Sequence, residues 1–228
     1  MCGRFAFYSS HEAMAALFRA EPVGAVEPRY NIAPTQDIAA VREPEQGRRE
    51  LVTLRWGLVP YWAKDPSIGN RLINARAETV AGKPAYREAY RKRRCLVLAD
   101  GFYEWRPGRE GKMPWFISLA SGEPFAFAGL WERWRDRESG ARLETAVIVT
   151  TAALGFIAEL HDRMPVVLDR QQADRWLAGD EGVLADAAGH PPALRAWPVD
   201  RQVNSAKNEG AELITPTGET VREESAGS

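Results

Sequence analysis

CLVLADGFYEW (residues 95–105) opens the densest run of strand-forming residues in the chain. It is followed by three more stretches rich in β-branched, aromatic and aliphatic residues, which are MPWFISLA (113–120), EPFAFAGLWERW (123–134) and ETAVIVTT (144–151). The turn-like segments RPGREGK, SGE and RDRESGAR join these strands as hairpin-like connections. Strands linked in this way do not fit a doubly wound parallel sheet.

The flanking segments add a few strands and short helices to this β region. Further strands are predicted at DIAAVRE, RELVTLRWGLVP, MPVVLD and LRAWPVD, helices at residues 9–19, 84–94, 152–161 and 170–179, and a loop at 21–36. We therefore expect the α+β class, as a single compact domain with a mixed, barrel-like β core and a few short flanking helices. The domain is predicted to span residues 1–216, and the polar residues 217–228 are expected to form a disordered tail.

Composition excludes several kinds of site. The formal net charge of −1 over 228 residues gives no global attraction to nucleic acid or membranes, so a polyanion site must be a local patch such as YRKRRC (90–95). No stretch approaches the roughly 20 apolar residues of a membrane span. Two cysteines and three scattered histidines lack the close ligand spacing of a zinc site. We expect a cytoplasmic protein without disulfides, metal or cofactor.

Cys2 stands directly behind Met1, and this position gives it two interpretations. Once Met1 is removed, Cys2 carries an α-amine with a pKa near ~7.7–8.0 beside its thiol. An amine attacks an aldehyde to form a Schiff base, and a neighbouring thiol can then close a five-membered thiazolidine ring. Alternatively, the thiol attacks an amide with the amine as base, or Cys2 is only a small apolar residue at the start of a strand.

Four further segments carry side chains suited to chemistry or binding. In LINARAET (72–79), Asn74 and Arg76 share a face if the segment is extended, and a guanidinium can bind a phosphate. Glu104 lies among aromatic residues, where burial would raise its pKa. His161 and Arg163 lie between a predicted helix and a strand, and WGLVPYWAKD (56–65) offers aromatic rings for base stacking. Each also has a structural interpretation, as a turn cap, a surface charge, a helix-terminal histidine or a loop covering the sheet.

Eight stretches occur in an order that resembles the SOS-response-associated peptidase family of abasic-site processing proteins. They are MCGRF, RYNIAPTQ, RWGLVPYW, LINARAET, ADGFYEW, VTTAA, HDRMPVVL and NSAKNEGAELI, and they run from Met1 to about Pro216. The resemblance implies a compact α+β domain with a barrel-like core. It also implies binding to single-stranded DNA containing abasic sites. We expect a monomer by default, in the cytoplasm and associated with the nucleoid when bound to DNA.

The resemblance assigns roles to particular residues. Cys2 would form the thiazolidine crosslink with the ring-opened sugar, Asn74 would orient the amine and the sugar, Glu104 would shuttle protons, and His161 would assist ring opening and reversal. Two sets of residues would contact DNA: Arg4, Arg76, Thr150 and Arg163 on its backbone, and Pro34, Tyr61, Trp62 and Trp105 near its bases. Tyr61 departs from the tryptophan pair of some members.

Two other functions fit the same residues. An N-terminal-nucleophile peptidase, acting on itself or on other proteins, would use the Cys2 thiol in acyl transfer. A non-covalent single-strand-binding module would leave Cys2 inert and would bind intact strands in a salt-sensitive way. The thiazolidine reaction requires that Met1 has been removed, since a retained Met1 blocks the Cys2 amine. The intact mass of the protein shows whether Met1 is present.

Overall fold

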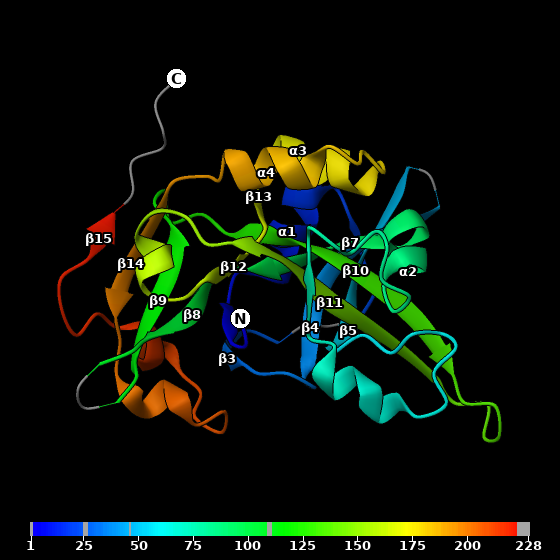
Figure 1. The fold of residues 1–228 in the computed structure, drawn as a ribbon, viewed down its shortest axis with the longest axis horizontal. Coiled ribbons are helices and arrows are strands. Elements are labelled where there is room, and N and C mark those ends of the chain that lie inside the picture. The colour runs from blue at the N-terminus through cyan, green and yellow to red at the C-terminus, as the bar shows by residue number, and fades with distance from the viewer. Residues whose placement is uncertain (1, 25–26, 46, 109–110, 223–228) are drawn as a thin grey trace.

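Five strands close into the β-barrel at the centre of the molecule (Figure 1). The computed structural model describes residues 2–24, 27–45, 47–108 and 111–222. The barrel strands in spatial order are β11 (Arg142–Ala152), β10 (Phe125–Arg135), β7 (Arg94–Ala99), β4 (Asp37–Glu45) and β5 (Arg48–Trp56). Neighbours pair antiparallel except where β5 closes the barrel against β11 in parallel, with Arg55 opposite Thr145. The expectation of an α+β domain with a barrel-like core is confirmed.

A second sheet of six strands lies beside the barrel. Its spatial order is β15 (Val221–Arg222), β14 (Leu194–Pro198), β9 (Met113–Leu119), β8 (Gly101–Arg106), β1 (Phe5–Phe7) and β3 (Arg29–Ile32). β7 and β8 are separated by Asp100 alone, so CLVLADGFYEW crosses directly from the barrel to the second sheet. The stretch that predicted the β core is therefore also the connection between the two sheets.

β1 joins the two sheets through its side chains. It pairs with β8, with Phe5 opposite Phe102, and the Phe5 ring packs on Trp56 and Phe127 of the barrel at centroid distances of 5.2 and 5.9 Å. All four rings are buried. Burying a large side chain of this kind contributes roughly 1.5–3 kcal/mol. The packing fixes β1, and with it Cys2, between the barrel and the second sheet.

Short elements complete the chain. The remaining strands are β2 (Glu21–Pro22), β6 (Asn74–Arg76), β12 (Arg163–Pro165) and β13 (Val167–Leu168), and the α-helices are α1 (His11–Phe18), α2 (Arg87–Lys92), α3 (Arg170–Leu177) and α4 (Val183–Gly189). Turns of 3-10 helix lie at Pro66–Arg71, Gly155–Glu159, Arg201–Asn204 and Ala211–Ile214. α3 begins at a capping box between Asp169 and Gln172. In the described part of the chain, no helix is long and apolar enough to cross a membrane.

Several predicted boundaries differ from the structure. The predicted loop at 21–36 contains β2 and β3, because both strands gain partners from distant parts of the chain, β5 and β1. The predicted helix at 152–161 is reduced to the 3-10 turn Gly155–Glu159. The predicted disordered tail is replaced at Val221–Arg222 by β15, which pairs with β14. Residues 223–228 lie outside the described residues.

Candidate active site and nucleic-acid interface

Cys2 is fully buried, three residues before β1 begins at Phe5. The β1–β8 pairing continues beyond Phe5, because the Tyr103 N–H donates to the Arg4 carbonyl at 3.0 Å, and this brings the N-terminal segment alongside Glu104. Burial, followed by the nearby carboxylate of Glu104, raises the pKa of the Cys2 thiol well above its usual range. The thiol is therefore protonated at neutral pH and needs a base before it can react.

Asn74 holds Cys2 from the barrel side. β6 pairs in parallel with β11, Asn74 lies opposite Ile148, and the Asn74 amide donates from Nδ2 to the Cys2 carbonyl at 2.7 Å. Its backbone carbonyl accepts from the Tyr86 hydroxyl at 3.2 Å. The other amide atom, Oδ1, is buried and has no hydrogen-bond partner among the described residues. A buried unpaired acceptor costs about 1–3 kcal/mol, and a ligand N–H or O–H would recover that energy.

Glu104 approaches Cys2 from the side of the second sheet. It lies in β8 opposite Trp115 of β9 and is almost completely buried. Burial, with a smaller contribution from the charge of Asp162, raises the pKa of Glu104 to about 7. A carboxyl with that pKa exchanges protons efficiently at cellular pH.

His161 lies between the Gly155–Glu159 turn and β12. Its Nδ1 accepts a hydrogen bond from the backbone N–H of Arg163 at 2.9 Å. Burial lowers the pKa of His161, whereas the neighbouring Asp162 carboxylate raises it. A neutral ring whose Nδ1 accepts a hydrogen bond carries its proton on Nε2.

A pocket of about 420 Å³ brings two of these groups together. It is lined by Glu104, Trp105, Lys112, His161 and Asn204. Lys112 is exposed on the β8–β9 hairpin, and its positive charge lowers the pKa of both Glu104 and His161. Sequence reasoning missed Lys112, because it lies in the predicted turn RPGREGK, where a lysine is an ordinary surface residue.

Asn31 and Asn204 were also missed, although both belong to stretches that carry the family resemblance. The Arg4 guanidinium donates from Nη1 to Asn31 Oδ1 at 2.6 Å and to the Val203 carbonyl at 2.7 Å, and it lies 5.9 Å from the Trp105 ring. Trp105 donates from Nε1 to Asn204 Oδ1 at 2.7 Å. Arg4 and Trp105, both predicted DNA contacts, are thus held by the 201–208 segment beside the pocket.

Arg76 and Trp62 lie on the other side of Asn74. Both line a second pocket of about 460 Å³, together with Asn74, Lys83 and Tyr86. The Arg76 side chain is exposed, and its charge is one of those that lower the pKa of Glu78. Asn74, which bonds the Cys2 carbonyl, therefore lines this second pocket, whereas Glu104 lines the first.

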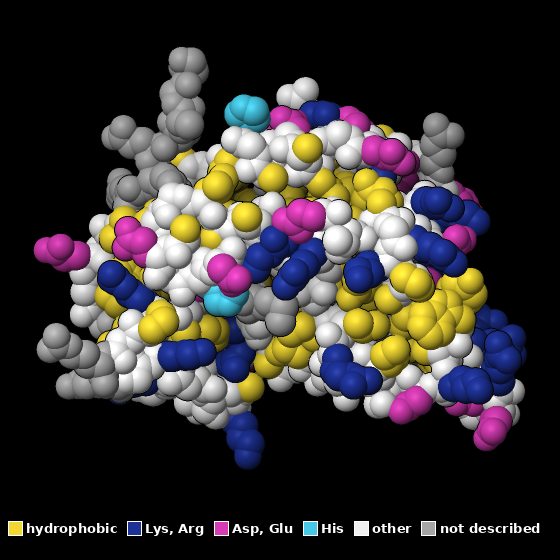
Figure 2. Space-filling view, viewed as in Figure 1, with side chains coloured by type: hydrophobic (Ala, Val, Ile, Leu, Met, Phe, Trp, Pro, Cys, Tyr) yellow, Lys and Arg dark blue, Asp and Glu magenta, His cyan; other side chains and the backbone are white. Residues whose placement is uncertain are grey.

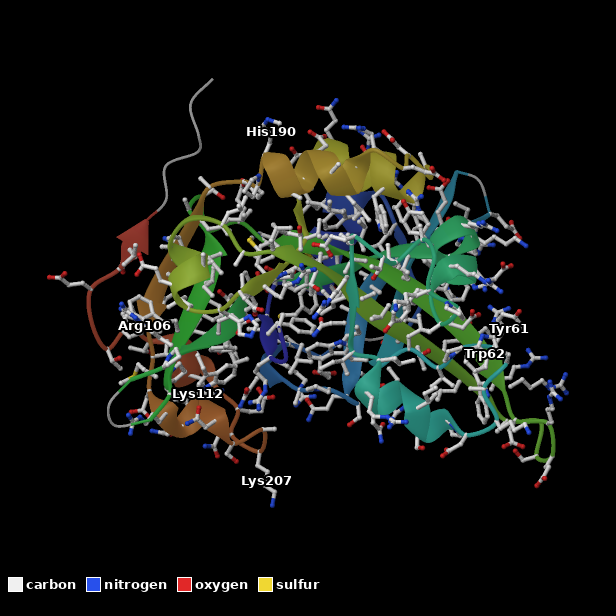
Figure 3. All side chains as sticks on the ribbon, in the orientation of Figure 1. Tyr61, Trp62, Arg106, Lys112, His190 and Lys207 are labelled. Atoms are coloured by element: carbon white, nitrogen blue, oxygen red, sulfur yellow. The ribbon has the colours of Figure 1, made fainter. Side chains whose placement is uncertain are left out.

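Tyr61 and Trp62 form the most exposed aromatic pair of the predicted interface. They are 56% and 44% exposed and lie at one edge of the molecule, away from Lys112 and Lys207 (Figure 3). Hydrophobic side chains gather over this edge, and Lys and Arg side chains run across the middle of the same face (Figure 2). Pro34 is half-buried between β3 and β4. The face therefore combines exposed rings with positive charge, which suits a single strand of nucleic acid.

Two predicted backbone contacts are not free surface groups. Thr150 is almost completely buried, opposite Arg76 in the β6–β11 pair. Arg163 forms a two-point ion pair with Glu78, with Nη1 and Nη2 donating to the two carboxylate oxygens at 2.7 and 2.9 Å, and Nη2 also donates to the Thr150 carbonyl at 2.7 Å. Within the described ranges, no group of three or more His, Cys, Asp or Glu side chains could hold a metal ion.

The sequence model of the SOS response associated peptidase (SRAP) family matches residues 1–206. This chain belongs to the SRAP family. It is 41% identical to the abasic site processing protein YoaM of Bacillus subtilis, over 94% of this chain and 97% of that protein. It is 35% identical to YedK of Escherichia coli, over 95% and 100% of the two chains, and 31% identical to HMCES of Gallus gallus, over 85% and 67%. Both of these relatives are also named abasic site processing proteins.

Solved structures share the SRAP chain's fold. A protein from Bacteroides thetaiotaomicron superposes with a TM-score of 0.81, covering 95% of this chain and all of that chain at 21% identity. A protein from Bordetella bronchiseptica gives a TM-score of 0.75 at 26% identity, covering 87% and 100%. The first of these likenesses concerns the fold alone, and it extends over nearly all of the SRAP chain.

Proposed function

We propose that this SRAP protein binds single-stranded DNA at abasic sites and forms a covalent thiazolidine with the exposed sugar through Cys2, after Met1 has been removed. The observation that carries the proposal is the convergence of Asn74 and Glu104 on Cys2. The Asn74 amide donates to the Cys2 carbonyl at 2.7 Å, and Glu104 is a buried carboxyl with a pKa of about 7. Three relatives that are 31–41% identical over most of this chain are named abasic site processing proteins, which supports the same substrate.

The proposed reaction proceeds from the amine to the thiol. The Cys2 amine adds to C1 of the ring-opened sugar, and loss of water gives an imine. The thiol sulfur then adds to the imine carbon, and the thiol proton ends on the ring nitrogen. Because burial keeps the thiol protonated, a base must take its proton during ring closure, and Glu104 supplies a carboxylate poised for that transfer.

His161 and Asn74 act before ring closure in this mechanism. Neutral His161, with its proton on Nε2, donates a proton while the sugar ring opens and when the crosslink reverses. The unpaired Oδ1 of Asn74 accepts a hydrogen bond from the amine or from a sugar hydroxyl. Arg76 and Arg4 attract the phosphates, and Trp62, Tyr61, Trp105 and Pro34 lie against the bases.

The test uses single-stranded DNA with one abasic site and the same strand without it. A heat-stable band on a denaturing gel is expected only with the abasic strand, and Cys2→Ala should abolish it. Intact mass of the free protein should show that Met1 is absent. Crosslinking by Cys2→Ala at the wild-type rate would overturn the assignment.

A peptidase acting on itself or on other proteins is the competing function. The raised pKa of the Cys2 thiol disfavours direct thiolate attack on an amide, which is why the amine-first reaction is preferred here. Turnover of peptides without DNA, combined with no covalent product at an abasic site, would replace the proposal by this function. Salt-sensitive binding to both strands with no covalent product would instead indicate a non-covalent binding module.

A further inference from the structure

Nδ1 of His161 lies next to groups with opposite hydrogen-bonding demands. The Arg163 N–H, which can only donate, is 2.9 Å away. The Asp162 carboxylate, which can only accept, is also 2.9 Å away, and the Arg163 carbonyl is at 3.2 Å. Nδ1 therefore either accepts from the Arg163 N–H as part of a neutral ring, or carries a proton and donates to Asp162 or to the Arg163 carbonyl. The two arrangements exclude each other.

The contacts of the Arg163 side chain favour the arrangement in which Nδ1 of His161 accepts a hydrogen bond. The side chain is 14% exposed, and its guanidinium donates to both carboxylate oxygens of Glu78 and to the Thr150 carbonyl. β12 has only three residues and Arg163 is its first, so strand pairing with Ala152 supports it on one side of the chain only. The ion pair with Glu78 therefore provides a second interaction that holds Arg163, whose backbone N–H donates to His161.

The competing arrangement is weaker. The Asp162 side chain is 85% exposed, and exposed ion pairs contribute only about 0.2–1 kcal/mol. Lys112 and Glu104 line the same pocket as the ring, and the positive charges of the N-terminal amine and of Lys112 disfavour a further positive charge on His161. The neutral arrangement therefore prevails while Arg163 stays in place.

We propose that Glu78 is a positioning residue that, through Arg163, holds His161 neutral with its proton on Nε2. Arg163 then serves His161 through its backbone while its side chain is paired with Glu78. In the reaction, which rests on the proposed function, this makes His161 a proton donor at Nε2. The positioning itself is a property of the free protein.

The test measures the His161 ring nitrogens by ¹⁵N NMR across a pH titration, without DNA. The chain has only three histidines, so a His161→Gln variant assigns the signals. Glu78→Gln removes the charge, and Glu78→Asp keeps the charge but shortens the reach needed for the two-point pair. The matched control is Asp174→Asn, because the Arg49–Asp174 pair has similar exposure, 17% and 49% against 14% and 51%, and joins β5 to α3.

Both Glu78 variants should shift the neutral ring toward the Nδ1–H tautomer and raise the pKa of His161, and the control should leave both unchanged. The direction separates positioning from simple charge loss. Removing the Glu78 charge alone leaves Arg163 uncompensated, which would lower the pKa of His161. An unchanged tautomer, or a lowered pKa in Glu78→Gln, would overturn the proposal.

A kinetic readout distinguishes this proposal from the function on which it rests. If wild-type protein crosslinks, both Glu78 variants should slow crosslinking at saturating DNA and change its pH profile, with folding verified by circular dichroism. If wild-type protein forms no crosslink, the proposed function fails while the NMR result still decides the role of Glu78.

Discussion

The surroundings of the chain's two cysteines differ, although both thiols are fully buried and burial raises the pKa of both. Cys95 lies in β7 of the barrel, where its carbonyl accepts from the buried Trp176 indole at 3.0 Å and the Gly129 backbone packs against it. Cys2 lies between the two sheets, where Asn74 and Glu104 reach it from opposite sides. Burial and thiol pKa therefore do not distinguish the two cysteines, whereas the polar groups around Cys2 do.

The largest expected effect separates the thiols directly. Cys2→Ser should lose the heat-stable crosslink completely, because a hydroxyl closes the ring poorly. Its amine should still form an imine, which borohydride reduction would trap. Cys95→Ser should crosslink at the wild-type rate once folded. Loss of crosslinking in folded Cys95→Ser would contradict the assignment of different roles to the two cysteines.

Glu104→Gln is the next largest effect. Removing a general acid–base typically costs about 10²- to 10⁴-fold in rate. We expect a loss of that order in the single-turnover rate of crosslinking at pH 7, together with loss of the rate change with pH near 7. The control is Glu132→Gln, another buried carboxylate that pairs with Arg93 in the barrel and should change stability without changing the rate. Wild-type kinetics in Glu104→Gln would remove Glu104 from the reaction.

The same carboxyl makes stability depend on pH. Because the folded pKa of Glu104 is raised from 4.5 to about 7, the folded state binds the proton more tightly than the unfolded state. Stability contributed by protonated Glu104 is thus lost as pH rises between about 4.5 and 7. Urea unfolding should show Glu104→Gln gaining stability relative to wild type across that window. A difference that stays constant with pH would contradict the raised pKa.

Gly129→Ala tests the packing around Cys95 in the barrel. A Cβ at Gly129 would lie 2.9 Å from both the Cys95 sulfur and Val97 Cγ2, so the barrel wall must shift. Overpacking of this kind costs about 1–3 kcal/mol, measurable by urea unfolding. Crosslinking by the folded fraction should be unchanged. Gly189→Ala is the control, because a Cβ there meets nothing within 4 Å.

Lys112→Gln should give the smallest effect. The positive charge of Lys112 lowers the pKa of Glu104, so its removal should move the pH midpoint of crosslinking upward. Lys112 is exposed, and high salt should therefore reduce the difference from wild type. Lys207→Gln, an exposed lysine outside the pocket lining, serves as the control. A downward shift of the pH midpoint of crosslinking in Lys112→Gln would contradict this role of Lys112.

Much of the fold could be read from the sequence, because its signals are local. Turn residues between strand-forming stretches predicted the β8–β9 and β10–β11 hairpins, whereas SGE joins β9 to β10 of the other sheet and forms no hairpin. The helix predicted at 170–179 corresponds to α3. Strands β2 and β3 escaped prediction, since they form only because β5 and β1 supply their partners. The C-terminal tail differs from its prediction for the same reason, because β15 forms by pairing with β14.

The sequence by itself determined the chemistry available, namely a cysteine behind Met1 and the Asn, Glu and His stretches of the family pattern. Only the tertiary structure decided which side chains are free to act. It buries Thr150, pairs Arg163 with Glu78, leaves Arg76 exposed and adds Lys112 to the pocket. The reason is physical: burial, ion pairing and pKa depend on neighbours that are distant in the chain, such as Arg163 and Glu78, and no local pattern records them.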